Sequence, residues 1–126
     1  MIAYLSGPIE NAHNDGADWR NDITYWLDKE LNHQVFNPVN ETKILTKDLN
    51  TEDFRMMKTT NPKQYKKIIR QIIQVDLNAV VKGSDYLIVN WDESVFKGGG
   101  THGEVTMAYW FNKPIFMVNA LPIEDV

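Results

Sequence analysis

Short apolar runs alternate along the chain with longer stretches in which apolar residues recur at helical spacing. The runs at residues 2–5, 34–38, 85–90 and 114–118 are bounded by Gly, Pro or polar residues, so each predicts a short β-strand. The third run has a continuous apolar centre, which is typical of a strand covered on both faces.

The stretches between these runs predict helices. Trp19, Ile23, Trp26, Leu27 and Leu31 form one amphipathic stripe, which Asn14 or Asp15 is expected to cap. A longer helix extends from about residue 65 to residue 80 and ends at Lys82-Gly83. A third helix, at about residues 101–112, follows three consecutive glycines. Strands that alternate with helices predict a parallel sheet between two helical layers, in one domain spanning residues 1–126.

Polar residues follow each predicted strand. In parallel α/β sheets, ligands bind beyond the carboxyl ends of the strands. Those ends carry Ser6-Gly7, Asn37, Asn90-Trp91-Asp92 and Asn119, and we expect these four tips to meet at one rim. The sequence therefore predicts the functional site there.

Residues 40–62 form a polar segment in which Phe54, Met56 and Met57 are the main large apolar residues. A segment of this length between regular elements is typical of a binding loop or lid. We predict a mobile cover over the site, with a short helix that Thr51 would cap.

Composition narrows the class of protein. A chain of 126 residues with 43% hydrophobic residues is large enough to form a core without disulfides or a structural metal. It contains no cysteine, which excludes thiol nucleophiles and fits a reducing cytoplasm. A net charge of −4 argues against binding to a nucleic-acid polymer. No apolar run is long enough to predict a membrane span, and no signal peptide is evident.

Motifs for common cofactors are also missing. The glycine run lacks the Lys-Ser/Thr ending of an ATP-binding P-loop, and the first turn lacks the glycine spacing of a dinucleotide fold. His13, His33 and His102 are scattered, so no metal site is predicted. We expect no cofactor, and we place His102 in a loop near the site.

Glu104 has two interpretations. Thr101-x-x-Glu104 matches a capping box, in which the glutamate accepts a hydrogen bond from the backbone of the capping residue. Alternatively, Gly98-Gly99-Gly100 and Gly103 let a ligand approach the backbone, and the helix N-terminus keeps the Glu104 carboxylate ionised. An ionised, positioned carboxylate is what nucleophilic attack on a sugar carbon requires.

Three other charged residues are candidates. Asp76 lies on the apolar stripe of the long helix, where it is either solvated at the edge of the stripe or turned into a cavity. Asp92 leaves the third strand at the rim, where Asp is also a common turn residue. Arg20 is either a surface charge or a group that holds a carboxylate or phosphate.

Several segments, in this order and spacing, resemble the nucleoside 2-deoxyribosyltransferase family. They are Tyr4-Leu5-Ser6-Gly7-Pro8, Trp19-Arg20, Phe36-Asn37-Pro38, Asp76, the run from Ser84 to Asp92, the run from Gly100 to Val105, Ala108 and Lys113-Pro114-Ile115. The resemblance covers most of the chain except residues 40–62, and the residues between Gly100-Thr101 and Glu104 depart from the usual family pattern.

The resemblance implies a flavodoxin-like α/β sandwich and transfer of 2-deoxyribose between bases through a glutamyl-sugar intermediate. It implies Glu104 as nucleophile, Tyr4 as the hydroxyl that orients it, and Asp76 and Asp92 as groups that hold the base and its proton. Ser6, Gly7, Arg20 and the glycine loop with Gly100, Thr101 and His102 would bind the substrate. Asn119 of a neighbouring subunit would contact the 5′-hydroxyl.

Two alternatives remain open at this point. Related families hydrolyse nucleoside 5′-monophosphates on the same scaffold, and a module that binds nucleotides without catalysis would use Glu104 only as a cap. The expected partners are a small nucleoside or nucleotide and a free base. Because Tyr109-Trp110-Phe111 is more aromatic than one helix face needs, we also expect a homo-oligomer.

Overall fold

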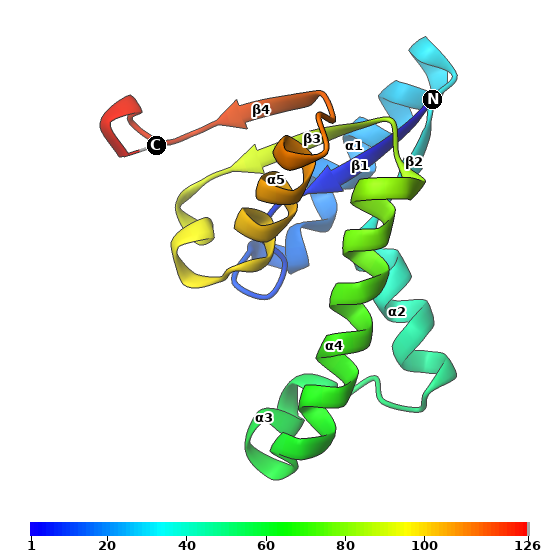
Figure 1. Cartoon of the computed structure of the whole chain (residues 1–126), viewed down its shortest axis with the longest axis vertical. Coiled ribbons are helices and arrows are strands. Elements are labelled where there is room, and N and C mark those ends of the chain that lie inside the picture. The colour runs from blue at the N-terminus through cyan, green and yellow to red at the C-terminus, as the bar shows by residue number, and fades with distance from the viewer. Residues whose placement is uncertain (126) are drawn as a thin grey trace.

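Residues 1–125 are described by a computed structural model, in which four strands form one parallel sheet (Figure 1). The strands are β1 (Ile2–Ser6), β2 (Gln34–Phe36), β3 (Tyr86–Trp91) and β4 (Ile115–Asn119), in the spatial order β2-β1-β3-β4. The two central strands are β1 and β3, with Tyr4 beside Leu87 and Ser6 beside Val89. The prediction of a single-domain α/β sandwich, Rossmann-like in architecture, is confirmed.

Helices cover both faces of the sheet. On one face, the short 3₁₀ turn η1 (His13–Gly16), helix α1 (Ala17–Trp26) and the π-helical turn η2 (Leu27–Leu31) follow β1, and Leu27 packs against Ala3, Leu5 and Tyr86. On the other face, Val80 and Ala108 pack against Tyr4, Leu87 and Val89. They belong to η4 (Ala79–Gly83) and α5 (Gly100–Trp110). Alternate residues of β1 therefore enter two separate cores, as strand geometry requires.

The polar segment at residues 40–62 is helical, which corrects the prediction of a loop with one short helix capped by Thr51. It contains α2 (Pro38–Asp48), η3 (Phe54–Met56) and α3 (Met57–Thr60), and it leads into the long helix α4 (Pro62–Asn78). Asn37 caps α2 through a 3.0 Å hydrogen bond from the backbone N–H of Val39. Phe54 packs against Ile68 and Ile72 of α4. These helices form an arm that extends away from the sheet (Figure 1).

The start of α1 also differs from the prediction. Asn14 and Asp15 adopt left-handed backbone conformations and do not cap the helix, which begins after Gly16 at φ 67°. A Cβ atom on Gly16 would lie 2.5 Å from Nη1 of Arg20, so this position requires glycine for both its φ and its space. The sequence pattern therefore located the helix but misjudged its first turn.

The end of the chain completes the sheet. After β3, the 3₁₀ segment η5 (Glu93–Lys97) leads through the glycine run into α5, and η6 (Ile123–Asp125) follows β4. None of the helices within residues 1–125 combines the length and apolar character needed to cross a bilayer.

Candidate functional site

A cavity of about 490 Å³ lies between the arm and the carboxyl end of β1. Its apolar wall comes from the arm and consists of Phe54, Tyr65, Ile69, Ile72 and Ile73. Its opposite side consists of the loop that follows β1, the glycine run and the first turn of α5. The charged residues that line it, within the described chain, are Glu10, Arg55, Asp76 and Glu104.

Glu104 is fixed at the inner end of this cavity. Its side chain is 8% exposed, and Oε1 accepts a 2.7 Å hydrogen bond from the hydroxyl of Ser6. The hydroxyl of Tyr4 donates to Oε2. Because α5 begins at Gly100, Glu104 is the fifth helical residue, and Gly99 precedes the helix without a side-chain cap. Glu104 is therefore not part of a capping box, and its carboxylate is directed at β1 and the cavity instead.

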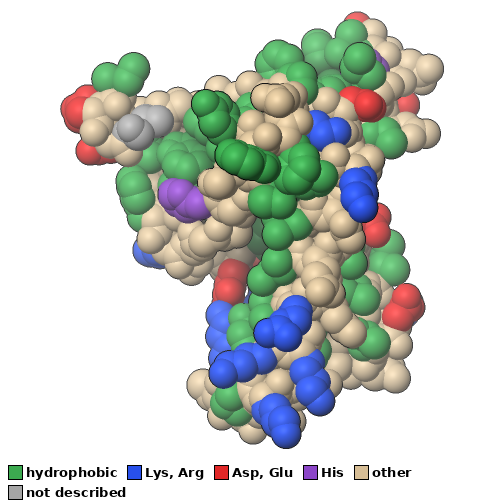
Figure 2. Space-filling view, in the orientation of Figure 1, with side chains coloured by type: hydrophobic (Ala, Val, Ile, Leu, Met, Phe, Trp, Pro, Cys, Tyr) green, Lys and Arg blue, Asp and Glu red, His purple; other side chains and the backbone are tan. Residues whose placement is uncertain are grey.

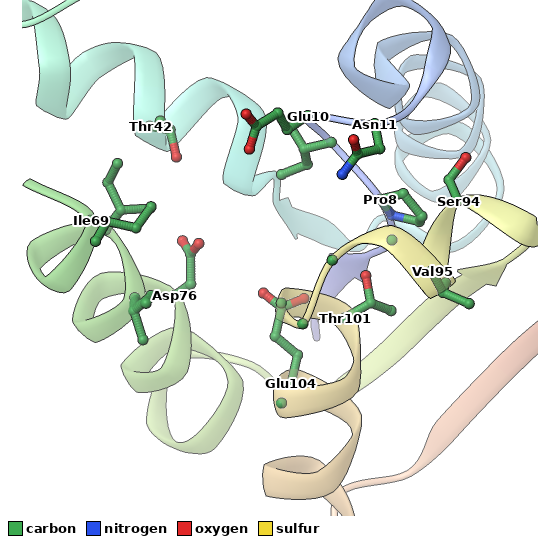
Figure 3. Close-up of a pocket in the computed structure, with 18 of the residues that line it drawn as sticks. Pro8, Glu10, Asn11, Thr42, Ile69, Asp76, Ser94, Val95, Thr101 and Glu104 are labelled. Atoms are coloured by element: carbon green, nitrogen blue, oxygen red, sulfur yellow. The ribbon is translucent and has the colours of Figure 1, made fainter. Parts of the chain in front are cut away.

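Asp76 faces the same space from the other side. Figure 3 shows the carboxyl groups of Asp76, from α4, and Glu104, from α5, directed into one cavity. The sequence left open whether Asp76 was solvated at the edge of its helix, and the structure places it in the cavity wall. Two carboxyl groups that share a partly buried space cannot both ionise at low cost.

The pKa values of these groups follow from burial and mutual repulsion. Burial, together with the charge of Glu104, raises the pKa of Asp76 to about 8, and the charge of Arg20 opposes this effect. Burial also raises the pKa of Glu104, whereas the hydrogen bonds from Tyr4 and Ser6 lower it. The pKa of the Tyr4 hydroxyl lies well above its ordinary value, mainly because of burial, so Tyr4 remains a proton donor to Glu104. At neutral pH Asp76 is therefore mostly protonated.

The glycine run forms part of the cavity wall. Gly98, Gly99, Gly100, Thr101 and Gly103 all line the cavity, and two of them, Gly100 and Thr101, are residues that the sequence analysis expects to bind substrate. A Cβ atom on Gly99, Gly100 or Gly103 would meet no atom of the described chain within 4 Å. Packing within the chain thus does not require glycine at these positions, and the missing side chains leave room for a ligand.

Gly7 also lines the cavity, but for a different reason. A Cβ atom there would lie 3.0 Å from the Trp19 ring and 3.3 Å from the carbonyl oxygen of Asn90. Glycine at this position lets the first loop pass closely over both residues. Ser6 and Gly7 are thus brought to the site as predicted, although Asn37 caps α2 and only the tip of β1 lines the cavity.

Arg20 is buried beneath the first loop and does not line the cavity, contrary to the prediction that it contacts substrate. Its guanidinium donates to the carbonyl oxygens of Gly7 at 2.8 Å and Gly16 at 3.0 Å. Longer contacts reach the carbonyls of Leu5, Pro8 and Asp15. Burial lowers the pKa of Arg20 to about 10, so it remains charged at neutral pH. Arg20 therefore holds the first loop in position through these hydrogen bonds.

Three further predicted residues lie outside the cavity in this chain. Asp92 caps η5, where it accepts a 2.9 Å hydrogen bond from the backbone N–H of Ser94. His102 donates from Nε2 to the carbonyl oxygen of Val95 at 3.1 Å and packs edge-on against Trp91. Asn119 forms a turn with Leu121. Asp92 and Asn119 were expected at the site because they follow strands, and His102 because it lies in the glycine loop. In each case hydrogen bonds to nearby residues occupy the side chain, and the contact of Asn119 with a neighbouring subunit's substrate stays a prediction.

Sequence reasoning missed Arg55, which is the cation that lines the cavity among residues 1–125. Its Nη1 lies 3.1 Å from Oδ1 of Asp15 in the first loop, and its guanidinium carbon lies 5.7 Å from the centre of the Phe54 ring. The available signal was the charge pattern, because the chain from Phe54 to Val75 contains six basic residues and no acidic residue. Reading residues 40–62 as a loop separate from the following helix concealed that pattern.

No cluster of three or more potential metal ligands occurs within residues 1–125. No protein-family model matches the chain, and no curated protein or solved structure matches it either. The resemblance to nucleoside 2-deoxyribosyltransferases therefore rests on the residues described above and remains a prediction.

Proposed function

We propose that this protein is an enzyme that cleaves the N-glycosidic bond of a 2′-deoxynucleoside or its phosphate and transfers the sugar to a second base. One observation carries the proposal: the Glu104 carboxylate, held by the hydroxyls of Tyr4 and Ser6, faces Asp76 across a cavity that could hold a nucleoside. A non-catalytic binding module has no need for a buried carboxylate fixed in this way.

In the proposed reaction, an oxygen of Glu104 attacks C1′ of the sugar. The C1′–N bond breaks as the C1′–O bond forms, and its electron pair passes to the base. The base takes a proton from the carboxyl group of Asp76, whose pKa of about 8 keeps that proton available at neutral pH. The products of this step are a free base and a glutamyl-sugar ester.

The second half reverses these steps with another base. A nitrogen of the incoming base attacks C1′, the Glu104 carboxylate leaves, and the nitrogen returns its proton to Asp76. Water in place of the base would give hydrolysis, so transfer and hydrolysis share the first half of the reaction. Positive charge that develops on the sugar in both transition states is stabilised by the carboxylate beside it.

The cavity wall suits a nucleobase. Phe54, Tyr65 and three isoleucines present flat and apolar surfaces, while Thr42 and Asn11 provide hydrogen-bonding groups. Ligand sites commonly combine a mostly apolar lining with a few polar groups that set orientation. These features support a base in the arm side of the cavity and the sugar near Glu104.

The test compares wild type with Glu104→Gln, which keeps the shape of the side chain and removes its negative charge. Each protein is incubated with the four common deoxynucleosides and their 5′-monophosphates, with and without free adenine, hypoxanthine, cytosine or thymine, and the products are separated by chromatography. Wild type should release base. The variant should release base at least about 1,000-fold more slowly, and its melting temperature should be unchanged. Glu93→Gln, an exposed glutamate in η5, is the matched control.

Mass spectrometry of quenched wild type should find a sugar adduct on the peptide that contains Glu104. If a folded Glu104→Gln protein retains turnover, Glu104 is not the nucleophile. Lost turnover without an adduct would favour a general-base role for Glu104 in direct hydrolysis.

We also propose a homo-oligomer, with a cytoplasmic location expected only from the composition. Tyr109 and Trp110 of α5 are 78% and 77% exposed, and Phe116 and Val118 of the edge strand β4 are exposed as well. Figure 2 shows hydrophobic side chains gathered in this upper part of the molecule. Light scattering after gel filtration should give a multiple of 14.6 kDa, and Trp110→Lys should reduce it.

A further inference from the structure

The charges that line the cavity are unevenly distributed. Asp76 and Glu104 direct their carboxyl groups into the inner part of the cavity (Figure 3). Arg55 also lines the cavity, and its side chain is 36% exposed to solvent. Glu10, the remaining charged residue of the described wall, is paired with Lys58 of α3. The cavity is therefore acidic where a sugar would react and basic at its edge.

The guanidinium of Arg55 has unused hydrogen-bond donors. Within residues 1–125, only Nη1 of Arg55 donates, to the two oxygens of Asp15 at 3.1 and 3.4 Å, so Nε and Nη2 have no partner there. A guanidinium presents these two nitrogens side by side, in the geometry that binds phosphate oxygens in pairs. Asp15 and the Phe54 ring hold the guanidinium in place. Because both partners of this ion pair are partly exposed, the pair itself is weak, and a phosphate dianion can compete for Arg55.

The arm around Arg55 carries an unusual excess of positive charge. Lys63, Lys66, Lys67 and Arg70 are spaced three or four residues apart on the exposed side of α4, and no acidic residue offsets them between Phe54 and Val75. Like charges at this spacing destabilise a helix, and alternating Glu and Lys would serve solubility better. Figure 2 shows Lys and Arg side chains gathered at this end of the molecule. In an otherwise acidic protein, this surface attracts anions towards the cavity.

We propose that Arg55 forms a phosphate-binding site at the edge of the cavity and that the substrate is a deoxynucleotide, with the phosphate on its sugar, rather than a free deoxynucleoside. This inference rests on the proposed function for the sugar and base, and adds the phosphate. An unphosphorylated nucleoside would leave the free donors of Arg55 unused. A nucleotide bound with its anion on Arg55 would keep that anion away from the ionised carboxylate of Glu104, which would repel it.

A polymer fits less well. The cations of α4 lie on the side of the helix away from Tyr65, Ile69 and Ile72, which face the cavity. Among the described residues, Arg55 is the cation that lines the cavity, so a phosphate bound inside the cavity would contact Arg55 and not the lysines of α4. The outer cations act on the substrate through their field and not through contact.

Calorimetric titration into the Glu104→Gln protein, which binds without turnover, tests the site. The ligands are the four common deoxynucleosides, their 5′- and 3′-monophosphates, inorganic phosphate and a ten-residue thymidine oligonucleotide. At least one monophosphate should bind about 10- to 100-fold more tightly than its nucleoside, and adding Arg55→Gln should abolish that difference. Arg55→Lys should restore only part of it, because lysine lacks the paired donors.

Arg70→Gln is the matched control, since it removes the same charge from the arm at a residue outside the cavity. It should change the affinity by less than about threefold at physiological salt. The comparison of 5′- and 3′-monophosphates identifies which ester reaches Arg55.

The outcomes separate this inference from the proposed function. Equal binding of nucleosides and monophosphates, or a preference that survives Arg55→Gln, overturns the phosphate site even when wild type releases base. An oligonucleotide that binds more tightly than every monophosphate overturns it in favour of a polymer. Absence of base release from all these substrates by wild type instead overturns the proposed function.

Discussion

Ser6 Oγ lies 2.7 Å from one carboxylate oxygen of Glu104, and Tyr4, two residues earlier on β1, donates to the other. Side chains two positions apart on a strand project from the same face, so a single buried strand fixes both oxygens of this carboxylate. The hydrogen bonds also favour the ionised form of Glu104, and they oppose the effect of its burial on the pKa.

Tyr4→Phe should therefore raise the pKa of Glu104 and slow base release. The acidic limb of the pH profile should move to higher pH, and the rate at pH 7 should fall about 10- to 100-fold. Tyr109→Phe removes a hydroxyl from an exposed residue of α5 and should change neither quantity. An unaltered acidic limb in Tyr4→Phe would show that this hydrogen bond does not control the ionisation of Glu104.

The rate of base release should follow a bell-shaped pH profile. Glu104 must lose its proton to attack, whereas Asp76 must keep its proton for the leaving base, so activity should decline above the pKa of Asp76 near 8. Measurement of kcat/KM between about pH 5 and pH 10 tests this. Asp76→Asn should be slower and should lack the alkaline limb. If that limb persists in the variant, another group is responsible for it.

Asp76→Asn should also stabilise the protein. Asp76 has a pKa of about 8 in the folded protein against an ordinary value of 3.8, so the folded state holds its proton over a pH range in which the unfolded state has lost it. The free energy of unfolding therefore falls as pH rises from about 4 to 8. Replacement should add on the order of 1–3 kcal/mol at pH 8 and less at pH 5. Urea unfolding at both pH values measures this, with exposed Asp22→Asn as control. Equal gains at the two pH values would contradict the assignment to Asp76.

Arg20→Ala should destabilise the fold rather than weaken phosphate binding selectively. It removes the donors to the carbonyls of Gly7 and Gly16 and leaves a cavity, at a cost of about 2–4 kcal/mol in unfolding free energy. Urea unfolding beside exposed Arg70→Ala tests this. A normally stable Arg20→Ala protein with impaired nucleotide binding alone would show that Arg20 contacts the phosphate after all.

The sheet and the inner end of the cavity could be predicted from the sequence, but the outer wall of the cavity could not. The four strands were predictable because each is a short apolar run between turn residues, and Glu104 stood out because a glycine run precedes it. Asp92 and His102 lie outside the cavity of this chain, because a strand end or a glycine loop limits where the backbone lies but not where a side chain turns. The contact of Asn119 with the site of a neighbouring subunit stays a prediction. The resulting bonds of Asp92 to Ser94 and of Asn119 to Leu121 are local and compete with any role at the rim.

The side chains of Arg20 and Arg55 also could not be placed from the sequence, for two different reasons. Nothing in the spacing of Arg20 distinguishes a guanidinium under a loop from one that faces solvent, because its partners are backbone carbonyls, which every sequence provides. The position of Arg55 depends on how the arm folds back over the first loop, a contact between residues 40 positions apart. Such long-range packing is invisible to helical periodicity.

The two sides of the cavity come from different parts of the chain, because the arm is inserted between β2 and β3. Tyr4, Ser6 and Glu104 belong to the sheet and to α5, whereas the wall opposite them, Asp76 included, is made of side chains on α2, η3 and α4. An exchange of residues within 38–75 would therefore alter the arm side of the wall without replacing Tyr4, Ser6, Asp76 or Glu104. Randomising Thr42, Phe54, Ile69 and Ile73 would redesign what the cavity admits, while the carboxylate that β1 holds in place stays untouched.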